Sequence, residues 1–133
     1  MSRTKGHNFE RVVASDLKQI FPEAKRGLAQ ARGNGRECPD VDGTPFHVEC
    51  KRGKRVSIRA ALAQARAATD GRPLLIVVRE DIDPKERART AQDGPDARAV
   101  ACMPWHSFVE LLALAYGHGA AVTTTADHAT PDT

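Results

Sequence analysis

The chain has 133 residues and a formal net charge of +3, with 41% hydrophobic and 28% charged residues. This length predicts one domain, and this composition excludes a chain that is disordered throughout. No apolar run approaches the roughly 18 residues that a membrane-spanning helix needs, so we expect no membrane span. The three cysteines form no paired motif, which favours a reduced, cytoplasmic protein over a disulfide-linked one.

Charge is divided unevenly along the chain. Residues 1–72 carry 15 Lys and Arg against 8 Asp and Glu, whereas residues 73–133 carry 5 against 9. Within the basic half, residues 37–50 hold four acidic residues and no Lys or Arg. Basic surface attracts polyanions, and carboxylates inside it favour a divalent cation that removes their repulsion of phosphate. The alternative is a solvated surface on which charges cluster by chance.

The first predicted element is an amphipathic helix over residues 5–20. Its apolar stripe consists of Phe9, Val12, Val13, Leu17 and Ile20. Residues 24–38 are rich in Gly, Arg and small residues without clear periodicity, so we expect a loop that contains a short strand.

A β-hairpin is predicted within residues 37–51. Asp-Gly followed by Thr-Pro within residues 41–46 marks the turn. The strand that follows alternates strictly, so its side chains divide between two faces. One face carries Phe46, Val48 and Cys50, and the other carries His47, Glu49 and Lys51.

The second half of the chain predicts further helices and strands. Ser57 is the expected N-cap of a helix that ends near Gly71. Residues 74–78 are apolar throughout, which is typical of a central strand covered on both faces. A strand is predicted over residues 98–103, and a helix over residues 104–116 whose apolar face includes the core residue Phe108.

Together these elements predict an α/β protein, a small mixed sheet flanked by helices. We expect one domain over residues 1–116. The charged connection over residues 80–97 has no assigned role, and residues 117–133 have the composition of a disordered tail.

Three residues of the hairpin suggest chemistry. Hairpin geometry returns Asp40 beside Glu49, and Lys51 shares the face of Glu49. Paired carboxylates repel each other and are preferred ligands of Mg²⁺, and a lysine beside them can orient or activate a water for attack on a phosphodiester. The alternative is a surface strand whose charges serve solubility.

The run Pro39-Asp40, followed by Glu49-Cys50-Lys51, resembles the PD-(D/E)XK nuclease motif. The sequence from Lys5 to Arg11 resembles the first helix of archaeal-type and phage Holliday junction resolvases, in which Lys-Gly precedes Glu-Arg. The resemblance covers residues 5–80 and, more loosely, residues 98–116. It implies a compact three-layer restriction-endonuclease-like core and a metal-dependent endonuclease that resolves four-way DNA junctions, in a bacterial cytoplasm or a phage-infected host cell.

The resemblance also implies a metal site. Asp40 and Glu49 would bind Mg²⁺ together with the backbone carbonyl of Cys50, and Glu10 would contact the metal through a water. Mn²⁺ is expected to substitute for Mg²⁺, and no organic cofactor is implied.

Lys51 would position the attacking water, and Gln64 matches a glutamine that related nucleases often carry on the helix after the motif. A solvent-facing helix residue is the alternative for Gln64. The chain departs from the archaeal resolvases at one point, because they carry a functional serine in the loop before Pro-Asp. This chain has no serine between Ser15 and Ser57, so Gln30 or an arginine replaces it, or the substrate geometry differs.

The expected partner is branched double-stranded DNA. Guanidinium groups suit bidentate contacts with phosphate, and a two-fold homodimer would present two equivalent sites to symmetric strands. The candidate DNA-binding residues are Lys5, Arg11, Arg26, Gln30, Arg32, Arg36, Lys54 and Arg55. For the arginines of the loop before the motif, a solvated loop is the alternative.

Other functions stay open at this stage. The same chemistry would serve a flap, fork or restriction-type nuclease or an RNA-directed one, and a DNA-binding module without catalysis would leave the motif residues on the surface. A zinc site from Cys38, His47 and Cys50 fits no common spacing. We expect His7, His47 and His106 to be exposed.

Overall fold

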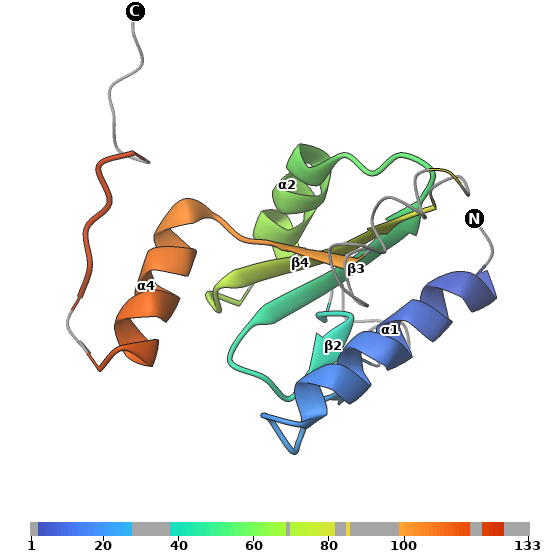
Figure 1. Ribbon diagram of the computed structural model, residues 1–133, viewed down its shortest axis with the longest axis horizontal. Helices are drawn as coiled ribbons and strands as arrows, with labels where there is room; N and C mark the ends of the chain where they lie inside the picture. The colour runs from blue at the N-terminus through green and yellow to red at the C-terminus, as the bar shows by residue number, and fades with distance from the viewer. Residues whose placement is uncertain are drawn as a thin grey trace, which may run out of the picture. The chain divides into compact units, whose positions relative to one another are not determined.

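The computed structural model describes residues 3–27, 38–68, 70–81, 85, 99–117 and 121–126, without the side chains of residues 3–6. The chain divides into two units, Met1–Cys102 and Met103–Thr133. In the described residues, the first unit holds a five-stranded mixed sheet with two helices, and the second unit holds one helix (Figure 1). The α/β class predicted from the order of elements is therefore confirmed, whereas most of the predicted 80–97 connection lies outside the described residues.

The elements of the first unit follow the predicted order. They are α1 (Arg3–Lys18), β1 (Lys25–Arg26), β2 (Val41–Asp42), β3 (His47–Gly53), α2 (Ile58–Ala68), β4 (Leu74–Glu80) and β5 (Ala99–Cys102). The strands lie side by side in the order β1-β2-β3-β4-β5. Only β3 and β4 pair in parallel, and α2 forms the crossover that a parallel pair requires.

The helices α1 and α2 cover opposite faces of the sheet (Figure 1). Along β4, Leu75 and Val77 pack against the α1 core, whereas the alternate residues belong to the α2 core. The buried α1 core consists of Phe9, Val13, Ala14, Ala24, Val41 and Val48. The buried α2 core consists of Ala61, Ala65, Leu74, Ile76 and Val78. The predicted central strand, covered on both faces, is confirmed.

Local signals for the two helices are confirmed in most respects. The Ser57 hydroxyl accepts a hydrogen bond from the amide of Ala60 at 3.1 Å, as an N-cap does. On α1, Phe9 and Val13 are buried as predicted. The predicted places of Val12 and Ile20 on the stripe are wrong, because Val12 is 52% exposed, while α1 ends at Lys18 and Ile20 is 71% exposed.

The predicted hairpin is confirmed. β2 and β3 are antiparallel, with Val41 opposite Val48. Gly43 has a φ of +80°, a left-handed conformation that glycine adopts without a steric penalty, and its amide donates to the Asp42 carboxylate at 2.9 Å. The turn therefore brings Asp40 back toward β3.

The second unit contains α4 (Trp105–Ala115), close to the predicted helix. No residue of α4 is buried and Phe108 is 40% exposed, so its predicted place in a core is wrong. Beside α4, Thr124 is buried, and its Oγ1 lies 3.1 Å from Nδ1 of His106. Among the described residues, no helix combines the length and apolar character of a membrane span.

Candidate active site

Asp40 and the Glu49-Cys50-Lys51 run meet where β2 pairs with β3. The amide of Asp40 donates to the Val48 carbonyl at 2.8 Å, and the amide of Cys50 donates to Oδ2 of Asp40 at 2.8 Å. The carboxylate of Asp40 is therefore held against the middle of the run, ten residues along the chain.

Glu10 approaches the same place from α1. Its Oε2 lies 2.9 Å from Nε of Arg26 on β1, in a partly buried ion pair. Burial raises the pKa of Glu10, and the negative charge of Asp40 raises it further, while the hydrogen bond and charge of Arg26 act in the opposite direction. Glu10 and Asp40 are thus close enough to repel each other.

The Cys50 thiol is influenced by three carboxylates. Burial is the largest cause that raises the pKa of its thiol, followed by the negative charges of Asp40, Glu10 and Glu49. Lys51 acts in the opposite direction. Carboxylates from α1, from the residue before β2 and from β3 therefore all act electrostatically on Cys50, and its thiol is protonated at neutral pH.

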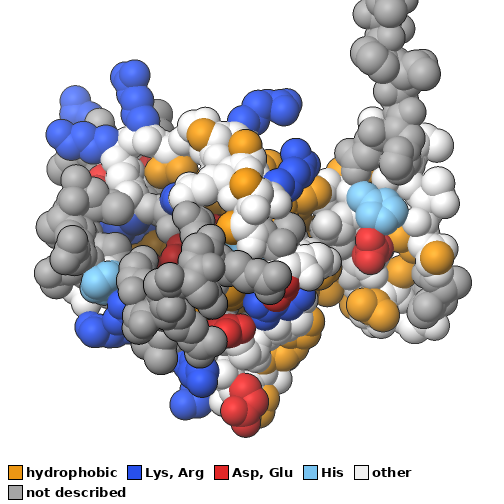
Figure 2. Space-filling model, turned by 180° about the vertical axis from the view of Figure 1, so that it is seen from behind, with side chains coloured by type: hydrophobic (Ala, Val, Ile, Leu, Met, Phe, Trp, Pro, Cys, Tyr) orange, Lys and Arg blue, Asp and Glu red, His pale blue; other side chains and the backbone are white. Residues whose placement is uncertain are grey.

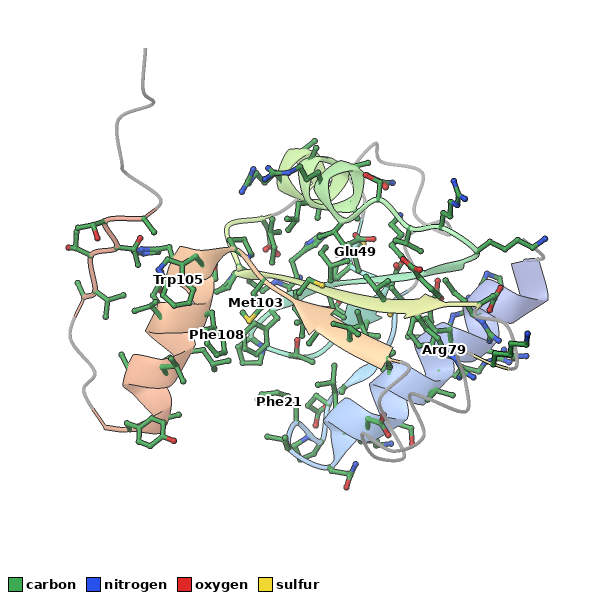
Figure 3. The ribbon with its side chains drawn as sticks, turned by 45° about the horizontal axis from the view of Figure 1, so that its top comes forward. Phe21, Glu49, Arg79, Met103, Trp105 and Phe108 are labelled. Atoms are coloured by element: carbon green, nitrogen blue, oxygen red, sulfur yellow. The ribbon has the colours of Figure 1, made fainter. Side chains whose placement is uncertain are left out.

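Glu49 lies on the side of the sheet that α2 covers (Figure 3). Its partner across the parallel ladder is Ile76, a member of the α2 core. Oε1 of Glu49 lies 3.0 Å from Nε2 of His47, two residues earlier on the same face of β3. The predicted alternation of the strand, with His47 and Glu49 on one face, is confirmed by this contact.

His47 itself corrects the prediction of an exposed histidine. Its side chain is 1% exposed. β3 lies between β2 and β4, and α2 covers the face of β3 from which His47 projects. Burial lowers the pKa of His47, and the positive charge of Arg72 lowers it further, so the ring is neutral. Within the described residues its Nδ1 is buried and has no hydrogen-bond partner, an arrangement that costs about 1–3 kcal/mol.

Lys51 and Gln64 are joined between β3 and α2. Nζ of Lys51 donates to Oε1 of Gln64 at 2.9 Å, across 13 residues of sequence. Gln64 is exposed, as a solvent-facing helix residue is, and it nevertheless restricts where the ammonium group points. The predicted pair of residues is therefore in contact.

The carboxylates fit a magnesium site with few protein ligands rather than a preformed cage. In the part of the chain that the structure describes, no group of three His, Cys, Asp or Glu side chains forms a metal cluster. Mg²⁺ is commonly held by one or two carboxylates, waters and substrate phosphate, and carboxylate oxygens are the donors present. A cation would also relieve the repulsion between Glu10 and Asp40.

The candidate DNA-binding residues are dispersed. Arg11, Lys54 and Arg55 are exposed, whereas Arg26 is paired with Glu10. On the face drawn in Figure 2, Lys and Arg side chains project from several sides of the first unit. Gln30, Arg32, Arg36 and the Lys5 side chain lie outside the described residues.

Two residues near the site were not predicted to support it. The amide of Gly27 donates to the Asp40 carbonyl at 2.8 Å, and a Cβ on Gly27 would overlap with the Pro39 carbonyl oxygen. His47 contacts Glu49. The period-2 pattern places His47 on the face of Glu49, so its position could be read from the sequence, but its burial depends on α2. Nothing in the sequence indicates the approach of Gly27 to Pro39.

Comparisons of the chain with protein-family models, with curated proteins and with solved structures found no match.

Proposed function

We propose that this protein is a Mg²⁺-dependent DNA endonuclease of the PD-(D/E)XK type, with a restriction-endonuclease-like core, that resolves four-way DNA junctions by paired symmetric nicks. One observation carries the proposal. The Cys50 amide donates to Asp40, Glu10 lies near enough to Asp40 for its pKa to be raised by it, and Glu49 and Lys51 flank Cys50 on β3. Carboxylates near an ammonium group are the residue types that metal-assisted phosphodiester hydrolysis uses.

In this proposal Asp40, Glu49 and the Cys50 carbonyl hold the metal, and Glu10 contacts it through water. When bound, the metal supplies a Lewis acid for the phosphate and lowers the pKa of a bound water.

The other steps belong to side chains of the protein. Lys51 donates a hydrogen bond to the attacking water and stabilises negative charge on the scissile phosphate. Gln64 holds the Lys51 ammonium by accepting its hydrogen bond at 2.9 Å.

The exposed residues Arg11, Lys54 and Arg55 would contact the DNA backbone. Two symmetric strands of a junction require two equivalent sites, so the proposal includes a two-fold dimer. Such an enzyme would work in a bacterial cytoplasm or in a phage-infected cell.

The test compares an end-labelled, immobile four-way junction with the matching linear duplex, each with Mg²⁺ or EDTA. We expect paired symmetric nicks on the junction alone, in Mg²⁺ alone. Asp40→Asn should abolish cleavage and retain binding, because asparagine keeps an oxygen that can accept from the Cys50 amide. Asp42→Asn is the matched control, since Asp42 is bound to Gly43 and Arg72 and has no role in the proposed chemistry.

Other outcomes identify the alternatives. Cleavage of both substrates would retain a nuclease and remove the junction selectivity. Binding that is indifferent to Mg²⁺, without cleavage by wild type, would indicate a DNA-binding module and contradict the proposed active site. An RNA duplex in the same assay separates an RNA-directed nuclease from a DNA-directed one.

A further inference from the structure

His47 and Glu49 are in contact inside the first unit. Both side chains are almost fully buried, and Nε2 of His47 lies 3.0 Å from Oε1 of Glu49. When Glu49 is ionised, as a metal ligand is, its oxygens only accept hydrogen bonds, so Nε2 is then the donor. The ring nitrogen on the other side, Nδ1, is buried without a partner in the described part of the chain.

This contact restricts the carboxylate of Glu49. The terminal torsion of a glutamate is broad, so an unrestrained carboxylate rotates among many orientations. A donor fixed in the strand two residues earlier restricts that rotation through Oε1. Side chains that hydrogen-bond a metal-binding carboxylate orient it in the same way in metal sites generally.

We propose that His47 is a positioning residue for Glu49, which holds the carboxylate in the orientation that binds a divalent cation. The inference rests on the proposed function, because it needs Glu49 to be a metal ligand. His47 touches neither metal nor substrate in this scheme and acts only through Glu49.

A space-filling role for His47 fits the structure less well. A residue needed only for packing on this face of β3 would bring no polar atom, and leucine would fill similar volume. The histidine instead brings two ring nitrogens into the interior, of which one contacts Glu49 and the other has no partner in the described residues.

Four variants of the full chain separate these roles. His47→Leu removes the donor and also removes the unpartnered nitrogen. His47→Gln places an amide N–H at about the reach of Nε2, whereas His47→Asn carries its amide nearer the backbone. His106→Leu is the matched control, because His106 also pairs with a glutamate, Glu110, at 2.8 Å, and lies in the second unit.

The main measurement is Mn²⁺ binding to the DNA-free protein, followed by water-proton relaxation, with metal-free thermal unfolding beside it. We expect His47→Leu to remain folded and to bind Mn²⁺ about 10- to 100-fold more weakly. His47→Gln should remain within about threefold of wild type, His47→Asn should resemble His47→Leu, and His106→Leu should not change the affinity.

Each result decides the inference. Wild-type affinity in His47→Leu would overturn it, as would equal affinities in His47→Gln and His47→Asn, a comparison that holds even if His47→Leu does not fold. If wild type cleaves junctions and these variants cleave with an unchanged Mg²⁺ requirement, the positioning role fails and the proposed function stands. If wild type neither binds Mn²⁺ nor cleaves any substrate, the proposed function fails and the inference fails with it.

Discussion

Nε of Arg26 lies 2.9 Å from Oε2 of Glu10, so an ion pair joins β1 to α1 at the candidate site. Burial and the nearby Asp40 disfavour the charged form of Glu10, and the ion pair with Arg26 offsets these effects only in part. The pKa of Glu10 therefore stays raised. A carboxyl group whose charged form the fold disfavours is typical of a site whose groups serve another purpose than stability.

Glu10→Gln should therefore stabilise the metal-free protein at neutral pH. Because the pKa of Glu10 is raised in the folded state above its ordinary value of 4.5, the folded state binds this proton more tightly than the unfolded state. Stability is thus lost as pH rises through the raised pKa. Glutamine avoids it and can still accept from Arg26, so Tm should rise by on the order of a few degrees.

Comparing the Tm of Glu10→Gln with that of wild type across pH tests whether the charge on Glu10 destabilises the fold. Thermal unfolding in EDTA should show the difference in Tm narrowing as pH falls through the raised pKa toward 4.5, and almost disappearing well below 4.5, where wild-type Glu10 is protonated in both states. A variant that is less stable than wild type at pH 7, or a difference that is constant with pH, would contradict the assignment.

Gln64→Ala should reduce cleavage by less than Lys51→Ala does. The hydrogen bond from Lys51 to Gln64 is exposed, so its loss is worth about 1 kcal/mol, a reduction in kcat of roughly fivefold. Lys51→Ala removes the proposed catalytic group itself and should cost about 100-fold or more. Single-turnover cleavage of the junction measures both effects. Gln64→Ala should have no further effect in the Lys51→Ala background, and an additive effect would show that Gln64 acts independently.

Gly27→Ala should disturb Asp40 through the backbone. A Cβ at Gly27 would overlap with the Pro39 carbonyl oxygen, and backbone cannot move aside as a flexible side chain can. We expect a loss of about 1–3 kcal/mol in the free energy of unfolding, with a loss of cleavage at temperatures at which the variant is still folded. Gly53→Ala is the control: a Cβ there meets nothing within 4 Å among the described atoms, and the expected change is within about 0.5 kcal/mol. Urea denaturation of both variants gives the comparison.

Ile76→Ala tests the support beneath Glu49. Ile76 is fully buried and lies in register with Glu49 across the parallel pair, so its truncation leaves a cavity in the α2 core. The expected destabilisation is about 2–5 kcal/mol in chemical denaturation. Val100→Ala is the control on β5, because Val100 is half exposed and its truncation opens no cavity in the core. Equal losses in both variants would contradict this account of the core.

Much of the fold was predictable because local signals and packing agree. Phe9 and Val13 lie at helical spacing and are buried, Ser57 caps α2, and the apolar run at residues 74–78 is the strand between two helical layers. The prediction for Ile20 is wrong because periodicity does not show where α1 ends. Phe108 fails because an apolar stripe on a helix does not say whether a second layer covers it.

The sequence predicted which residues form the candidate site, but not the burial and the ion pairs around them. The motif brings Asp40 to Cys50, and the hairpin register explains why. The burial of His47 depends on α2 and β4, which lie beyond the hairpin in sequence. Likewise Arg26 was predicted as a phosphate contact from its loop, and only the three-dimensional structure shows its ion pair with Glu10.

β4 contributes none of the candidate active-site residues, yet β3 depends on it for its parallel partner and for both cores. Every candidate residue has been synthesised once the ribosome reaches the end of α2 at Ala68. At that moment β3 would still lack its parallel neighbour, and Ala61 and Ala65 would have no sheet residues of β4 to pack against. We therefore expect a nascent chain to form the site only after β4 has left the exit tunnel. The site would then form late in synthesis, although all of its residues are made early.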